Sequence, residues 1–167
     1  PILCYNLLFL STFVLSAAGA WLLVRDLTGN RLAAFAAGLL YAWAPYRLAQ
    51  SPHLQVLSAQ WMPFALYWMR RYLADPTRRR PLLLSTLAFV AQGLSCGYYL
   101  FYFAPFLATF ALWEMARLGR WRDRRVWADL TGAALLAGAL TVPLLLPYLA
   151  ARDLFRLQRS LPEVASL

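Results

Sequence analysis

The sequence has no lysine, and acidic residues and histidine are scarce in it. Seven acidic residues stand against sixteen basic ones, all of them arginine, and the formal net charge is +9. Ion-driven transporters usually carry ionisable groups at mid-membrane depth, and no acidic residue lies in the middle of a long apolar run. Ion-coupled transport is therefore disfavoured. The single histidine, His53, shows no interpretable arrangement with a serine and an acid, so a hydrolytic triad is unsupported.

Cysteine is also scarce, and its positions exclude a cysteine-based site. The two cysteines, Cys4 and Cys96, lie in apolar surroundings and lack the spacing of metal ligands. We expect both to be inert packing residues. The basic charge does not indicate nucleic-acid binding either, because the arginines cluster in short loops between long apolar runs, as topology determinants of membrane proteins do.

Apolar residues dominate what is present. They make up 62% of the chain, against roughly 45–50% in an ordinary globular domain, which predicts an all-α, polytopic membrane helix bundle. The pattern predicts about six crossings over residues 1–150: residues 2–24, 32–44, 52–72 and 129–150, and two more within the uncharged run 82–113, which turns at residues 92–97. Residues 151–167 alternate charged and apolar side chains, as an amphipathic helix on the membrane surface does.

The arginine-rich loops predict the orientation. Residues 74–81 and 117–125 are strongly basic, and by the positive-inside rule both loops are expected on the cytoplasmic side. Both chain ends are then extracytoplasmic. The chain starts with Pro1 inside an apolar run, which predicts that it is the central part of a longer protein.

Local patterns predict two contacts and one helix kink within this bundle. Ala34 and Gly38, four residues apart, permit close helix packing. Glu114 and Arg117 have the spacing of an ion pair on one helix. Pro63 frees the carbonyl of Ala59 and predicts a kink near mid-membrane in the third crossing.

Polar chemistry concentrates in residues 46–63, which hold the only histidine, three glutamines and an isolated arginine. Ser51 followed by Pro52 predicts a helix that begins at Pro52, after a turn or short interfacial helix over residues 45–51. His53 and Gln55 would then lie in a first turn that favours an anion such as phosphate, with Arg47 adding charge. The alternative is that His53 faces lipid headgroups and Arg47 is a topological anchor.

Tyr98 and Tyr99 follow the predicted turn at residues 92–97 and form an aromatic rim on the extracytoplasmic side. A simple interfacial belt explains them. The alternative is that they stack on a sugar.

Together these segments resemble the middle of bacterial polytopic glycosyltransferases of the GT-C class. The resemblance rests on residues 41–47 (YAWAPYR), 51–55 (SPHLQ), 60–63 (QWMP), the arginine-rich loop, the Gly-Tyr-Tyr turn, residues 146–148 (LPY) and residues 159–163 (RSLPE). It implies transfer of a sugar from a polyprenyl-phosphate donor to a glycan or lipid acceptor on the extracytoplasmic face.

The resemblance also implies roles for individual residues. Arg47, His53 and Gln55 would hold the donor phosphate, and Tyr98 and Tyr99 would contact the sugar or the lipid. The acidic motif that supplies the catalytic acid in such enzymes is absent, so no catalytic residue is assigned. No metal site or cofactor is expected in this chain, although a divalent metal remains an option for the full-length protein. The alternative is a non-enzymatic multi-pass protein or a carrier of lipid-linked glycans.

Overall fold

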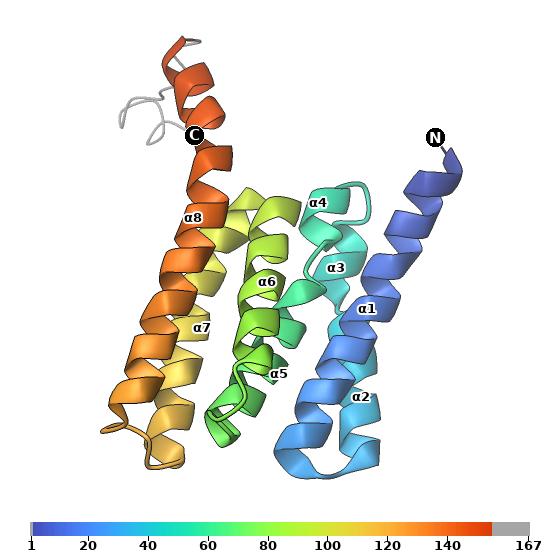
Figure 1. The fold of residues 1–167 in the computed structure, drawn as a ribbon. Helices are drawn as coiled ribbons and strands as arrows, with labels where there is room; N and C mark the ends of the chain where they lie inside the picture. The colour runs from blue at the N-terminus through green and yellow to red at the C-terminus, as the bar shows by residue number, and fades with distance from the viewer. Residues whose placement is uncertain (1, 155–167) are drawn as a thin grey trace, which may run out of the picture.

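The structure, a computed structural model, describes residues 2–154 and is all-helical over them (Figure 1). Their eight helices are α1 (Ile2–Thr28), α2 (Arg31–Ala42), α3 (Pro45–Ala49), α4 (Leu54–Leu57), α5 (Trp61–Ala74), α6 (Arg80–Ser95), α7 (Gly97–Arg117) and α8 (Arg124–Leu154). The amphipathic segment predicted over residues 151–167 lies outside the described residues, except for its first four, which continue α8.

The six longer helices lie side by side, and short α3 and α4 sit at one end of the bundle (Figure 1). We call this the α4 end. The opposite end carries the α1–α2 turn, the α5–α6 loop and the α7–α8 loop, and we call it the arginine end. α1 begins and α8 finishes at the α4 end, so both lie opposite the arginine-rich loops (Figure 1).

Three of the described helices are long and apolar enough to cross a membrane, namely Ile2–Thr28, Gly97–Arg117 and Arg124–Pro143. This composition is compatible with membrane insertion. α2, α5 and α6 have 12, 14 and 16 residues, which is shorter than the roughly 17–25 that a crossing helix needs. The six continuous crossings predicted from the sequence are therefore not confirmed.

The third predicted crossing, residues 52–72, is wrong as a continuous helix. Ser51 and Pro52 form a turn, and α4 starts only at Leu54. The backbone leaves helical geometry again at Ser58 and Ala59 before α5 begins at Trp61. Pro63 is thus the third residue of α5, where the missing N–H is one of the four amides that need no helical partner. It starts a helix and does not kink one.

The short helix predicted over residues 45–51 is confirmed as α3, which begins at Pro45. The predicted turn at residues 92–97 is confirmed as well, because Cys96 alone separates α6 from α7. Both junctions lie at the α4 end.

α1 and α2 form a close-packed pair. The Asn30 side chain accepts hydrogen bonds from the amides of Leu32 and Ala33, at 2.9 and 3.1 Å, and so caps α2. A Cβ on Gly38 would lie only 2.8 Å from the carbonyl oxygen of Ala17. The predicted close contact through the small residues of α2 is confirmed.

A buried network of ion pairs joins α1, α5 and α7 at the arginine end. Arg70 on α5 lies 2.7 Å from Asp26 of α1 and 3.0 Å from Glu114 of α7. The predicted Glu114–Arg117 pair is confirmed at 2.7 Å. Glu114 is fully buried, so it lies inside the bundle and not on its surface.

Asp129 organises a second polar contact at the same end. It accepts a hydrogen bond from the buried Tyr72 hydroxyl at 3.0 Å and pairs with Arg79 at 2.8 Å. In the α5–α6 loop, the Thr77 hydroxyl donates to Asp75 and lowers the pKa of that carboxyl. All five acidic side chains that the structure describes therefore lie at the arginine end, and each is within 4.0 Å of an arginine.

Candidate functional site

Arg47 is the charged group buried at the α4 end. Its side chain projects from α3 and the residue is only 6% exposed. Nε donates to the carbonyl of Ala42 at 3.1 Å, and Nη2 donates to the carbonyl of Thr12 on α1 at 3.3 Å. The Ala42 carbonyl is free to accept because α2 ends there and its last turn has no helical partner.

Aromatic rings surround the same guanidinium. Its central carbon lies 5.4 Å from the ring centre of Phe13 and 5.9 Å from that of Tyr41. Nη1 has no hydrogen-bond partner, and Arg47 forms no ion pair with the described side chains. Burial of a charge costs several kcal/mol when no opposite charge offsets it. The site therefore favours an anion at Nη1.

The break between α4 and α5 lies beside this arginine, and side chains from three helices donate to backbone carbonyls in the break and in the single turn of α4. Tyr41 of α2 donates to the Ala59 carbonyl at 2.9 Å, and Gln92 of α6 donates to the Ser58 carbonyl at 2.6 Å. Tyr99 of α7 donates to the Val56 carbonyl at 2.7 Å. Non-helical backbone is tolerated in a membrane protein only where its polar groups find such partners.

Two glutamine oxygens near this break lack a partner. Gln60 and Gln92 are 7% and 1% exposed, and Oε1 of each makes no hydrogen bond with the described residues. Together with Nη1 of Arg47 they offer one donor and two acceptors. We call Tyr41, Arg47, Gln60, Gln92 and Tyr99 the Arg47 cluster. It can bind an anion at the arginine and hydroxyl or amine hydrogens at the glutamines.

The structure separates the five predicted site residues into two groups. Arg47 and Tyr99 belong to the Arg47 cluster. His53, Gln55 and Tyr98 are exposed at the α4 end, and Tyr98 retains 73% of its accessible surface.

The phosphate site predicted at the start of a helix at Pro52 is wrong in its geometry. His53 only precedes α4, whose four residues are a single turn and no crossing helix. The anchor interpretation of Arg47 is equally at odds with its burial.

Sequence reasoning missed Gln92 and Tyr41 as site residues. Each lies in an apolar helix that contains other polar or aromatic residues, and no local sequence pattern marks it as a site residue. Their contacts join residues 18 and 34 positions apart. One signal was present for Gln60, because it lies in the stretch of residues 46–63 where polar residues concentrate.

Within residues 2–154, no group of three or more histidine, cysteine or acidic side chains could hold a metal ion. Comparison of the chain with protein-family models, with curated proteins and with solved structures gave no match.

Proposed function

We propose that this chain is part of an integral membrane glycosyltransferase that transfers a sugar from a polyprenyl-phosphate donor to a glycan or lipid acceptor. The membrane is the bacterial inner membrane, with the arginine end in the cytoplasm and the α4 end outside. The donor phosphate binds at Arg47.

One observation carries this proposal, namely a buried arginine with a free N–H group and no ion pair to a described side chain. A guanidinium is planar and matches the oxygens of a phosphate, and such charge-assisted hydrogen bonds are about twice as strong as neutral ones. A phosphate at Nη1 would compensate the buried charge. The apolar and aromatic surroundings of Arg47 suit a phosphate that is attached to a lipid.

The proposal gives the other predicted residues separate roles. Tyr99 holds the Val56 carbonyl and keeps the α4–α5 break in place. His53, Gln55 and Tyr98 lie exposed at the same end, where they would contact the sugar or the lipid headgroup. The catalytic group stays unassigned.

A non-enzymatic carrier of lipid-linked glycans is the second candidate. It is favoured by the distribution of acidic side chains, since all five that the structure describes are paired with arginines at the arginine end. A general base must lie within hydrogen-bond reach of the acceptor hydroxyl. A carrier would use the Arg47 cluster for binding alone.

Donor binding by Arg47→Gln and wild-type protein in lipid nanodiscs tests the phosphate site. Wild-type protein should bind polyprenyl phosphate in preference to polyprenol of the same length. Arg47→Gln should bind the phosphate about tenfold to a hundredfold more weakly, because a hydrogen bond to a charged group contributes roughly 1.5–3 kcal/mol. Arg31→Gln, an exposed arginine at the other end, is the control.

Equal binding of the phosphate and the alcohol by the wild-type protein would refute the phosphate site. His53→Ala measured in parallel shows whether the exposed histidine contributes to donor binding. Transfer of a radiolabelled sugar to acceptor supports the enzyme, whereas transbilayer movement of the intact donor without product supports the carrier.

A further inference from the structure

A cavity of about 640 Å³ lies among α6, α7 and α8, and no residue of the Arg47 cluster lines it. Small residues line its two facing walls, Ala104, Ala108 and Ala111 on α7 and Ala134, Ala137 and Gly138 on α8. Small residues of this kind allow helices to pack closely. In this structure, however, a cavity separates the small residues of α7 from those of α8.

The cavity is open along part of its length. Ala108 and Ala134 are exposed, and a Cβ built on Gly138 would meet no atom within 4 Å. α7 and α8 are both among the helices apolar enough to cross a membrane. In a membrane that these two helices cross, the opening would face lipid hydrocarbon.

The chemistry of the walls favours a hydrocarbon chain over a polar ligand. Three of the four hydroxyl groups in the lining donate to backbone carbonyls: Ser85 to Ala65, Thr86 to Leu82 and Thr141 to Ala137. These hydroxyls are committed to the protein. An acyl chain needs no hydrogen bond and gains from burial against the apolar walls.

At the arginine end the cavity reaches Trp127, which is part of an aromatic and basic surface. The Trp127 indole N–H donates to the Trp121 carbonyl at 2.9 Å, and the two rings meet edge to face at 5.7 Å. Indole rings of this kind sit at the headgroup level of a bilayer. The surface thus lies where a lipid headgroup meets its chains.

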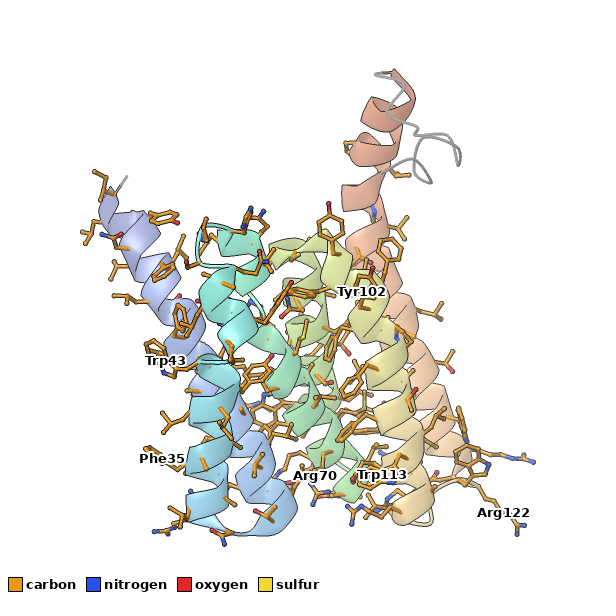
Figure 2. All side chains as sticks on the ribbon, turned by 180° about the vertical axis from the view of Figure 1, so that it is seen from behind. Phe35, Trp43, Arg70, Tyr102, Trp113 and Arg122 are labelled. Atoms are coloured by element: carbon orange, nitrogen blue, oxygen red, sulfur yellow. The ribbon has the colours of Figure 1, made fainter. Side chains whose placement is uncertain are left out.

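Arg122 and Arg124 supply free charge beside these rings. Both are exposed, and neither forms an ion pair with the described side chains. Asp123 between them lies 4.0 Å from Arg120 and caps α8 by accepting from the Arg125 amide at 3.0 Å. Figure 2 shows Arg122 pointing away from the bundle.

We propose that this cavity binds an acyl chain of an anionic phospholipid, whose phosphate is held by Arg122 and Arg124 beside Trp121 and Trp127. Charge complementarity selects the headgroup, and basic sites next to membrane helices on the cytoplasmic side do recognise anionic lipids. The site is independent of the donor site at Arg47, which lies at the opposite end of the bundle.

Lipid retention by the purified protein, measured by native mass spectrometry, tests the headgroup. Offered equal amounts of phosphatidylglycerol and phosphatidylcholine, the wild-type protein should retain phosphatidylglycerol. Arg122→Ala/Arg124→Ala should bind it about thirtyfold more weakly, because each arginine near an anionic surface contributes about 1 kcal/mol. Arg25→Ala/Arg31→Ala removes the same charge from the α1–α2 turn and should lose less than about threefold.

A pair of glycine variants tests the acyl chain. Gly138→Leu adds a bulky side chain at a cavity position where a Cβ meets no atom within 4 Å, and it should abolish retention, whereas Gly138→Ala should reduce it partly. Gly132→Leu is the matched control, since Gly132 is also in α8 and also faces open space but does not line the cavity. Glycerol phosphate, which has the headgroup phosphate and no acyl chain, should not displace the lipid.

Any of four results overturns the proposal. Equal retention of the two lipids, or equal losses in the two double-arginine variants, would mean that Arg122 and Arg124 recognise no headgroup. Equal retention by Gly138→Leu and Gly132→Leu, or displacement by glycerol phosphate, would mean that the cavity holds no acyl chain.

Discussion

Arg70 and Glu114 meet inside the bundle, with Nη1 of the arginine 3.0 Å from Oε2 of a carboxylate whose side chain has no exposed surface. Nε of the same guanidinium lies 2.7 Å from Oδ2 of Asp26. One arginine of α5 thus bridges acidic groups of α1 and α7. This contact holds the two halves of the bundle together at the arginine end, although the helices concerned are far apart in sequence.

Glu114→Ala should therefore lower the free energy of unfolding by roughly 3–5 kcal/mol, because it leaves a largely buried Arg70 without one of its two carboxylates. Reversible unfolding in mixed micelles, followed by circular dichroism, measures the loss. Arg78→Ala is the control, since Arg78 forms only an exposed pair with Asp75, and it should unfold like the wild type. Equal stability of Glu114→Ala and the wild type would show that the network adds nothing.

Tyr99→Phe should lower the stability of the protein by about 1–3 kcal/mol, because the partly buried Val56 carbonyl loses its hydrogen bond. Tyr98→Phe is a matched control in the next position, where the side chain is 73% exposed and its hydroxyl bonds none of the described residues. The same unfolding measurement applies. Similar stabilities for the two variants would contradict the role given to Tyr99.

Gly38→Ala should weaken the packing of α1 on α2. The added methyl would lie 2.8 Å from the Ala17 carbonyl oxygen, which belongs to backbone and can yield only if the helices separate. Overpacking of this kind costs typically 1–3 kcal/mol. Gly132→Ala meets open space and should instead stabilise α8 slightly, since alanine favours a helix by about 1 kcal/mol over glycine.

Single cysteines test the orientation. After replacement of the exposed Cys4 by serine, a cysteine at Thr77 or Arg122 should be protected from an impermeant thiol reagent added outside the cell. A cysteine at Ser51 should react. Labelling at Thr77 from outside would reverse the assignment of the arginine end to the cytoplasm.

The helical class and several junctions could be predicted because their causes are local. Pro45 begins α3, and the glycines at residues 93 and 97 flank the α6–α7 junction. Local sequence carries each of these signals.

The break at residues 58–59 and the burial of Arg47 could not be predicted, because their causes are distant in sequence. Ser51-Pro52 has the pattern of a helix start, but three carbonyls just beyond it find partners on α2, α6 and α7. Because these partners satisfy the backbone carbonyls, the helix can be interrupted at a place where the apolar run alone predicts that it continues. In the same way, Arg47 is held by the Thr12 carbonyl, 35 residues earlier.

The Asp26–Arg70 contact also bears on the order in which the protein assembles. Chains are made from the N-terminus onward, and α1 and α2, joined by a turn of two residues, can pair as soon as both have been synthesised. Arg70, which bonds Asp26 in the folded protein, is synthesised 44 residues later. During that interval the Asp26 carboxylate lacks the partner that it has in the folded bundle, and the arrival of α5 supplies it.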